Sequence, residues 1–280
     1  MRVSLSSTLG ANLSLVVVSH NTCAVTLVCL AKVASAYPEL ELIVVDTGSS
    51  DGSPELIEEK FPSARLLGVA NRGYPYAVNR GLELARGEYL IEMNSDIFLK
   101  PGDLEAIIEP LADSKVALSG PTLVDANGKL QGFGLFSRPP SGRVRLRSWI
   151  SGALIALRRE TLETIGAMDQ RFVFYNDDLE WGLRARRLGY RVVQVPRRVL
   201  HLGGASTPKD PRFLAEGYRG GMLVSREYYP KLHPWHRRLV SLEAGLRVRL
   251  DPDSNRRSAY QMIGRMARAG ELDSSPLALE

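Results

Sequence analysis

The first half of the chain alternates short runs of apolar, β-branched residues with longer segments whose apolar residues recur every three or four positions. Runs of the first kind predict buried strands, and segments of the second kind predict helices. We expect strands at residues 13–19, 41–46, 65–69 and 88–93, helices at residues 22–37, 53–60 and 75–86, and a further helix beginning at Pro101. Strands and helices in this order predict a Rossmann-like, mostly parallel sheet with helices on both faces.

The pattern changes after an expected strand at residues 116–124. A turn follows, and segment 132–147, rich in Gly, Pro, Ser and Arg, is expected to form a loop over the site. The elements expected next are a strand at 150–157, helices at 159–165 and 178–188, a strand at 191–195, and helices from Pro211 onward. This organisation predicts an α/β catalytic domain over residues 1–206, with halves at 13–124 and 125–206, and a helical C-terminal extension over 207–280.

The composition is that of an ordinary globular protein, with 44% hydrophobic and 24% charged residues among 280. No apolar run approaches the roughly 20 residues of a membrane helix, and the first ten residues do not resemble a signal peptide. We therefore expect a cytoplasmic protein. Cys23 and Cys29 have no metal-ligand spacing and are expected to be reduced packing residues.

The formal net charge of +5 is concentrated near the C-terminus, where residues 231–268 hold nine Lys or Arg against three Asp or Glu. Apolar and basic residues are interleaved there: Trp235, Leu239, Leu242, Leu246 and Val248 alternate with Arg237, Arg238, Arg247 and Arg249. One interpretation is a basic amphipathic helix that contacts the inner face of the plasma membrane peripherally. The other is that the apolar residues pack the tail onto the catalytic domain.

Three polar residues follow expected strands, where open α/β sheets bind their ligands: Asn21, Asp46 and Asp96. Asp46 begins a polar turn at residues 46–53, and its acidic residues could equally be turn formers. Asp96 could cap the following helix. No glycine-rich nucleotide loop is present, so a divalent cation is the expected partner of a diphosphate. Mg²⁺ or Mn²⁺ would suit Asp96, with His201 a further candidate ligand.

A second acidic group, Asp177, Asp178 and Glu180, follows the aromatic stretch 172–175. Crowded carboxylates raise one another's pKa toward the range useful for a general base. The same residues at the start of a helix also fit a capping box from Asp177 to Glu180. Both interpretations remain open at this point.

An ordered set of segments resembles the family 2 inverting glycosyltransferases, most nearly a rhamnosyltransferase-like branch. The segments are 16–22, 44–53, 71–74, 77–81, 94–96, 151–153, 166–169, 177–178 and 201–206. The resemblance implies a GT-A fold, a nucleoside-diphosphate-sugar donor (dTDP-, UDP- or GDP-linked) and Mg²⁺ or Mn²⁺. It also implies a saccharide or lipid-linked saccharide acceptor in cell-surface polysaccharide or glycoconjugate synthesis, and no nucleic acid.

The resemblance assigns roles to individual residues. Asp178, with Asp177 as the alternative, matches the general base, and Asp96 and His201 match the metal site. The nucleotide-sugar site would include Ser19, Asn21, Asp46, Ser49, Asp51, Asn71, Gly73, Asn79 and Asn94, and the acceptor side Ser151, Gly152, Asp169 and Tyr175. Two positions depart from the family pattern: Asn94 stands where the metal motif has Asp, and Asp177 where the acidic pair has Glu.

Two other functions share parts of this pattern. A nucleotidyltransferase also combines a Rossmann-like half with a metal-binding aspartate, but segment 19–22 is not its basic glycine-rich loop. A noncatalytic sugar-nucleotide-binding protein would need neither Asp96 nor Asp178. The presence of both favours the glycosyltransferase.

Overall fold

A computed structural model describes residues 12–131, 142–203 and 210–277. The first ten residues, most of the loop expected at 132–147, and residues 204–206 of the His201 segment lie outside the described residues. Within the described part of the chain, no helix is long and apolar enough to cross a membrane.

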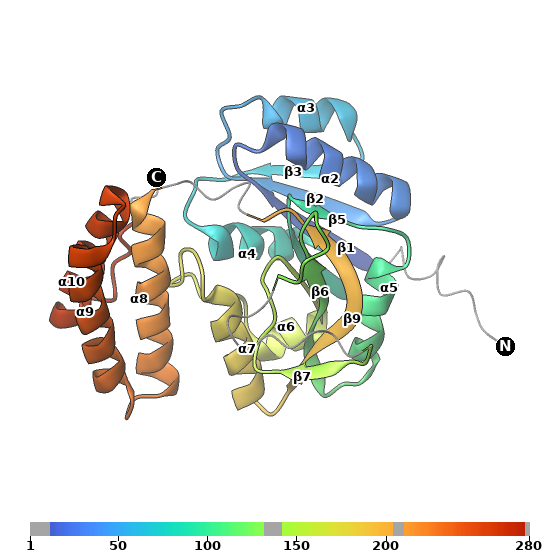
Figure 1. The fold of residues 1–280 in the computed structure, drawn as a ribbon. Coiled ribbons are helices and arrows are strands. Elements are labelled where there is room, and N and C mark those ends of the chain that lie inside the picture. Colours follow the sequence, from blue (N-terminus) through green and yellow to red (C-terminus); the bar gives the residue numbers. More distant parts are fainter. Residues whose placement is uncertain (1–11, 132–141, 204–209, 278–280) are drawn as a thin grey trace.

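The first four main strands form the expected parallel half of a sheet (Figure 1). They are β1 (Leu13–Ser19), β2 (Glu41–Asp46), β3 (Arg65–Gly68) and β4 (Tyr89–Asn94), arranged in the order β3-β2-β1-β4. Each pair is parallel, so the carboxyl ends of β1, β2 and β4 lie at one edge. The helices that link them are α2 (Cys23–Ala36), α3 (Ser53–Lys60) and α4 (Tyr74–Leu84), close to their expected ranges.

The second half of the sheet is mixed. Its strands are β5 (Ile97–Phe98), β6 (Val116–Val124), β7 (Arg145–Arg147), β8 (Leu154–Arg158) and β9 (Arg191–His201). β8 enters antiparallel between β4 and β6, and β6 pairs with β9 in parallel. The strand expected at 150–157 begins later, at Leu154. Residues 145–147 were expected in a loop but form strand β7. β9 extends six residues beyond the expected end, because pairing with β6 continues past two register shifts.

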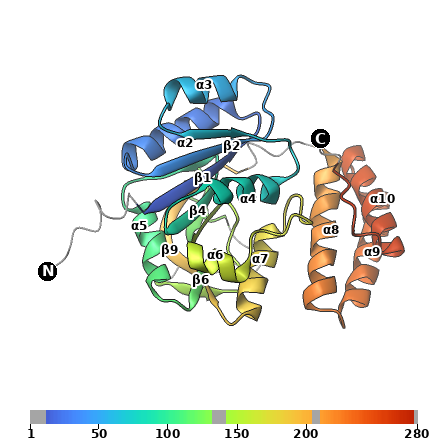
Figure 2. The same ribbon diagram turned by 180° about the vertical axis from the view of Figure 1, so that it is seen from behind.

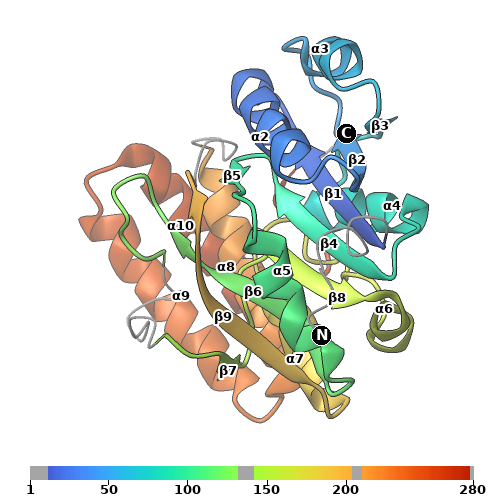
Figure 3. The same ribbon diagram turned by 90° about the vertical axis from the view of Figure 1, so that its right-hand side faces the viewer.

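Helices cover both faces of the sheet, as Figure 3 shows from the side. One face packs against α2, α3 and α5 (Asp103–Ile108), and the short 3-10 helix η1 (Glu109–Ala112) follows α5. The opposite face packs against α4, α6 (Arg159–Ile165) and α7 (Asp177–Arg187). Pro101 precedes α5 by two residues instead of opening it. Cys29 lies in α2 and is buried, and both cysteines are free as expected.

The C-terminal extension is helical, as expected, and consists of α8 (Pro211–Tyr228), α9 (His233–Leu250) and α10 (Ser254–Ala269). The three helices stand side by side next to α7 (Figures 1 and 2) and share a third apolar cluster with Phe172 and Leu183. A fully buried ion pair, Glu216 with Arg219, fixes this contact. Arg219 donates to the carbonyls of Arg171 and Leu272, and the Val173 N–H donates to Glu216. The extension therefore holds the segment that leads into α7.

Candidate active site

The carboxyl ends of β1, β2 and β4 bring together the polar residues that were expected to meet. Ser19 pairs with Asp46 across β1 and β2, and Val18 pairs with Asn94 across β1 and β4. Asp96 follows β4 by two residues and is almost fully buried. Because these ends share one edge, Asp46, Asn94 and Asp96 border the same part of the molecule.

The turn after β2 is organised by Asp46. Its carboxylate accepts hydrogen bonds from the Ser49 N–H (2.8 Å) and the Ser49 hydroxyl (2.6 Å). Asn21 adopts a left-handed conformation (φ 49°), donates its N–H to the Ser49 hydroxyl, and accepts from the Ser50 N–H at 2.8 Å. Asp46 therefore forms the turn, and together with Asn21 it gives this end of the sheet an ordered polar edge.

Several residues named for the nucleotide-sugar site have structural contacts in this fold. Asp51 accepts from the N–H groups of Cys23 and Ser53, at the starts of α2 and α3. Asn79 is buried and holds the Met168 backbone with both ends of its amide (2.8 and 3.0 Å). Their side chains are accordingly engaged in joining elements.

Gly73 is required by packing against the loop before α7. It has φ 100°, and a Cβ atom there would lie 2.5 Å from the Val173 carbonyl oxygen. Asn71 accepts only a long contact from the Gly73 N–H, at 3.4 Å. On the acceptor side, Asp169 is ion-paired with Arg171, which also pairs with Glu227 of α8. These contacts fix the positions of loops around the cleft.

His201 is the last residue of β9, not a loop residue beyond a shorter strand, and this places it beside Asp96. His201 Nε2 lies 3.2 Å from Asp96 Oδ1, while Asp96 Oδ2 accepts from the Gly203 N–H at 3.0 Å. Asp96 Oδ1 is buried and accepts no hydrogen bond from any described residue. An orphaned carboxylate oxygen therefore faces the imidazole nitrogen.

Gln131 settles which nitrogen of His201 carries the proton. Its side-chain NH₂ donates to the His201 carbonyl at 2.8 Å, which turns its carbonyl oxygen toward His201 Nδ1 at 2.5 Å. Nδ1 must then donate, and in the neutral ring Nε2 keeps its lone pair. A neutral ring therefore presents the Nε2 lone pair toward Asp96 Oδ1, 3.2 Å away.

This arrangement fits a divalent cation. Adjacent ligands of an octahedral ion with bonds of about 2.1 Å are about 3 Å apart, close to the observed 3.2 Å. The described residues contain no group of three or more His, Cys, Asp or Glu side chains placed to hold a metal. Asp96 and His201 would therefore supply two ligands and leave the others to substrate oxygens and water, as is common for Mg²⁺ and Mn²⁺.

The acidic pair lies at the start of α7, where Asp178 is partly buried and Asp177 buried. Asp178 accepts from the Gly152 N–H at 2.9 Å and from its neighbour's N–H, Leu179, at 2.7 Å. Burial raises the pKa of Asp178 to about 6, although these hydrogen bonds oppose the change. Burial, with the charge of Asp178, raises the pKa of Asp177 well above its usual value. Asp178 is thus the carboxylate that ionises near neutral pH.

Gly152 and Ser151 lie opposite this pair. A Cβ atom on Gly152 would come within 3.1 Å of the Asp178 Cβ, so the close approach favours glycine. Ser151 accepts from the Ala153 N–H at 3.3 Å and shapes the same turn. Gly152, expected on the acceptor side, thus lies beside Asp178, the expected base.

The predicted capping box is wrong. The N-cap of α7 is Asn176, and no side chain caps it. Glu180 instead pairs with Arg184 and accepts from the Tyr228 hydroxyl of α8. Tyr175 and Asn176 both have positive φ (67° and 63°), an uncommon conformation for such residues that stores strain directly before the acidic pair.

The sequence interpretation did not include two residues behind Gly152. Glu92 of β4 is fully buried, and its pKa is raised well above its usual value by burial and by Asp177 and Asp178. The Tyr74 hydroxyl contacts the Glu92 carboxyl and lies 3.2 Å from the Gly152 carbonyl. The Tyr74 hydroxyl can donate to the Glu92 carboxyl or to the Gly152 carbonyl, since both acceptors lie within hydrogen-bond distance. Glu92 and Tyr74 thereby support the peptide that holds Asp178.

Comparison with known proteins supports one family. The sequence model described as glycosyl transferase family 2 matches residues 14–182. An N-acetylglucosaminyl-diphospho-decaprenol L-rhamnosyltransferase of Mycobacterium tuberculosis is 27% identical over 213 residues, covering 61% of this chain and 69% of that protein. The O-antigen biosynthesis protein RfbC of Myxococcus xanthus is 27% identical over 269 residues, which are 86% of this chain but 21% of that protein.

The fold is similar to that of a solved glycosyltransferase. The mannosyltransferase PcManGT from Pyrobaculum calidifontis, solved in complex with GDP-Man and Mn²⁺, superposes with a TM-score of 0.56 at 19% identity. The match covers 93% of this chain and 86% of that one. This similarity confirms the expected GT-A fold.

Proposed function

The chain belongs to glycosyl transferase family 2 and is a glycosyltransferase, and we propose that it moves a sugar from a nucleoside-diphosphate sugar to an acceptor hydroxyl with inversion. The observation that carries the proposal is the state of Asp178. Its carboxylate is held by the Gly152 N–H, is partly open to solvent, and has a pKa of about 6. General-base catalysis needs a carboxylate of this kind within reach of the incoming hydroxyl.

The transfer is a single displacement. Asp178 takes the proton of the acceptor hydroxyl while that oxygen bonds to the anomeric carbon and the bond to the diphosphate breaks. Inversion follows because the new bond forms on the face opposite the leaving group. Burial and the charge of Asp178 raise the pKa of Asp177 well above its usual value, so Asp177 loses its proton less readily than an ordinary aspartate and opposes the ionised Asp178 less.

A divalent cation, Mg²⁺ or Mn²⁺, would be held by Asp96 and His201. When bound, it supplies charge neutralisation to the departing diphosphate, an effect worth several kcal/mol. The turn ordered by Asp46 and Asn21 would receive the nucleoside. Nothing in these contacts selects between dTDP, UDP and GDP.

The sequence relatives suggest the class of acceptor. One of them, by its name, uses a diphospho-decaprenol-linked sugar, and another takes part in O-antigen synthesis. From these names we propose that the enzyme acts in cell-surface polysaccharide or glycoconjugate synthesis, with a saccharide or lipid-linked saccharide acceptor. We also propose a cytoplasmic location, which rests on the sequence analysis alone.

Donor hydrolysis tests the proposal directly. Purified protein is incubated with dTDP-, UDP- and GDP-sugars, with Mn²⁺, with Mg²⁺ and with EDTA, and release of the nucleoside diphosphate is measured. We expect metal-dependent release from one donor class. Release of pyrophosphate from a nucleoside triphosphate and a sugar phosphate would instead identify a nucleotidyltransferase, and absence of any turnover would favour a noncatalytic binding protein.

The C-terminal helix α9 carries a surface suited to an anionic membrane. Six large apolar side chains repeat along one stripe at intervals of three or four residues and are 57–72% exposed: Leu232, Trp235, Leu239, Leu242, Leu246 and Leu250. Arg238 and Arg249 lie along one edge of the stripe. Val248 is not part of it, since it packs inward, and Arg237 is tied to the Ala267 and Arg268 carbonyls. An apolar stripe with a basic edge matches an interfacial helix that docks on anionic lipid.

Flotation with phosphatidylglycerol vesicles tests this surface. We expect the protein to float at low salt, and the variant with Leu239, Leu242 and Leu246 changed to Ser to stay in the dense fractions. The matched control is Leu188→Ser, which alters an exposed leucine at the end of α7. A concentration-dependent dimer that the triple variant abolishes, without vesicle binding, would overturn the membrane assignment in favour of a second copy of the chain.

A further inference from the structure

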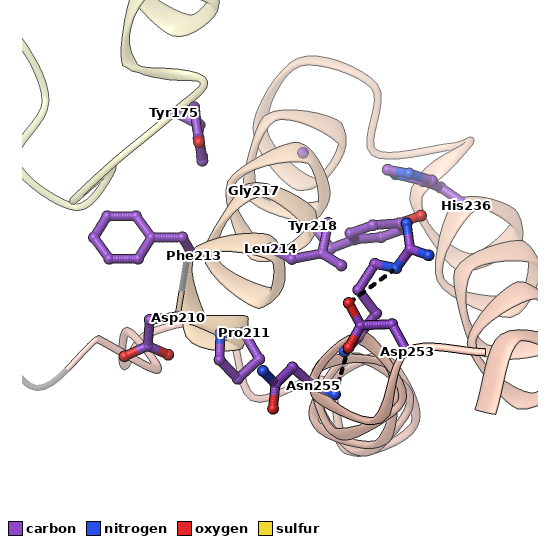
Figure 4. A pocket seen from close by; sticks show the side chains of 12 residues that line it. Tyr175, Asp210, Pro211, Phe213, Leu214, Gly217, Tyr218, His236, Asp253 and Asn255 are labelled. Carbon is purple, nitrogen blue, oxygen red and sulfur yellow. Dashed lines mark hydrogen bonds and ion pairs between the residues drawn. The ribbon is translucent and has the colours of Figure 1, made fainter. Parts of the chain in front are cut away.

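A hollow of about 780 Å³ lies beside the loop that carries the acidic pair, between Tyr175, the first half of α8 and the start of α10. Figure 4 shows Tyr175 and Phe213 on one side of it and Asp253 and Asn255 on another. We call this hollow the α8 groove. Tyr175 lines the groove and precedes Asp178 by three residues, so one loop before α7 carries both a groove residue and the acidic pair.

The floor of the α8 groove is made of helix backbone, because α8 has glycine at positions 217 and 221. Glycine weakens a helix interior, so each one calls for a reason. Gly220 has a packing reason: a Cβ atom there would lie 2.7 Å from the Asn176 side-chain nitrogen. At Gly217 the nearest atom would be 3.5 Å away, and at Gly221 4.0 Å, so packing permits a methyl group at both. What a methyl group would reduce at these two positions is the space in the groove.

The walls combine aromatic rings with unpaired polar groups. The rings of Tyr175 and Phe213 both border the space, and each contacts Phe174 edge to face. The Tyr175 hydroxyl and the Asn255 side-chain amide form no hydrogen bond with any described residue, so they are available to a ligand. Aromatic faces next to hydroxyl and amide groups complement a sugar ring, which has an apolar face and a rim of hydroxyls.

The charges in the groove argue against a phosphate. Arg256 is paired with Asp251 at 3.1 Å and lies 3.9 Å from Asp253. Asp210 is paired with Arg212 at 2.6 Å. The groove therefore offers carboxylates and a neutralised guanidinium, where a diphosphate would need uncompensated positive charge. An alkyl chain would make no use of the Tyr175 hydroxyl or the Asn255 amide, whereas a saccharide would.

We propose that the α8 groove binds the saccharide part of the acceptor and presents its hydroxyl to Asp178. This assignment rests on the proposed function and names the acceptor subsite. The left-handed Tyr175–Asn176 turn is part of it, because the Asn176 side chain donates to the Gly217 carbonyl at 2.9 Å and fixes the wall to the floor.

The glycines provide the test, because the variants are expected to separate stability from binding. Gly217→Ala and Gly221→Ala fill the groove while improving helix propensity, so their Tm should stay the same or rise. Gly245→Ala is the matched control: it is also a helix glycine, in α9, with no atom within 4 Å of its Cβ position and outside the α8 groove. Asn255→Ala removes a hydrogen-bonding group from an exposed position of α10.

The probe is a panel of methyl glycosides of hexoses, N-acetylhexosamines and rhamnose, with binding followed by saturation-transfer NMR. We expect at least one to bind the wild-type protein, with an affinity at least tenfold lower in Gly217→Ala and Gly221→Ala, lower in Asn255→Ala, and unchanged in Gly245→Ala. Equal binding by all variants, or binding of octyl chains but of no glycoside, would overturn the assignment. Donor hydrolysis by the wild-type protein is read separately: its absence counts against the proposed function, and its presence with unaffected glycoside binding counts against the groove alone.

Discussion

Replacement of Asp178 by Asn should abolish transfer and stabilise the fold at the same time. The carboxylate is held at a pKa of about 6 against 3.8 for an ordinary aspartate, a difference of about 2.2 units. At 1.36 kcal/mol per unit, ionisation of Asp178 costs the folded state about 3 kcal/mol above pH 7. Asparagine avoids this cost but can accept through only one atom. It therefore loses one of the two backbone hydrogen bonds, from Gly152 or Leu179, worth about 1 kcal/mol. The expected net gain is about 1–2 kcal/mol.

The raised pKa of Asp178 determines how the stability difference between the two proteins changes with pH. A carboxyl whose folded pKa lies above its unfolded pKa contributes stability that is complete below pH 3.8 and is lost as the pH rises through about 6. Urea unfolding of the wild type and Asp178→Asn should thus show the variant more stable at pH 8. The advantage should shrink through pH 6 and reverse near pH 4, where only the lost hydrogen bond remains.

Activity should follow the opposite course. For the wild type, kcat should rise with pH around an apparent pKa near 6 and then level off. This apparent pKa belongs to the coupled pair Asp177 and Asp178. Asp178→Asn should lower kcat by a factor of about 10²–10⁴ and leave donor affinity within about twofold. A variant that is less stable than the wild type at pH 8, or retained transfer together with a loss in Asp177→Asn, would refute the assignment of Asp178 as the base.

Three further substitutions test the surroundings of the site. Asp96→Ala should remove metal-dependent turnover and Mn²⁺ binding measured by electron paramagnetic resonance, with circular dichroism unchanged; turnover at the wild-type rate with saturating donor and Mn²⁺ would contradict it. Gln131→Leu should weaken Mn²⁺ binding by about 10- to 100-fold because His201 loses the acceptor that fixes its tautomer, whereas Gln131→Glu should preserve it; Asn127→Leu, an exposed amide on the same turn, is the control. Tyr74→Phe should lower kcat more than it changes the donor KM and shift the pH profile, because the link from Glu92 to Gly152 is cut; an unchanged pH profile would assign Tyr74 to packing alone.

The sequence predicted the parallel half of the fold closely because each element there is specified locally. Strand β2 and helix α3 have the expected bounds, since an apolar run and a proline near the helix start mark them directly. The errors lie where partners distant in the chain decide the outcome. β9 runs on to His201 because β6 and β5 pair with it, and segment 145–147 becomes a strand because β9 offers an edge. No local pattern contains that information.

The residues of the candidate site also fall into those marked locally in the sequence and those identified only by distant contacts. Asp46, Asp96, Asp178 and His201 could be proposed from the sequence because motif order and strand ends mark them. Glu92 is noticeable in the sequence because it is a charged residue inside the apolar strand Tyr89–Asn94. Its role becomes clear only from its contact with Tyr74. Nothing in the sequence marks Gln131, because a glutamine after a turn is common. Its role follows from its contact with His201 at the end of β9. Supporting residues are specified by tertiary contacts, so the motif indicates His201 as a proposed ligand but not Gln131, which orients it.

The acidic pair itself depends on the C-terminal extension, although the two are far apart in sequence. The Val173 N–H donates to Glu216, the Asn176 side chain donates to the Gly217 carbonyl, and Gly220 lets α8 approach this turn. These contacts restrain two adjacent left-handed residues, a conformation that is uncommon outside glycine and costs free energy. Helix α8 therefore restrains the turn that leads into α7 and to Asp178, the proposed base.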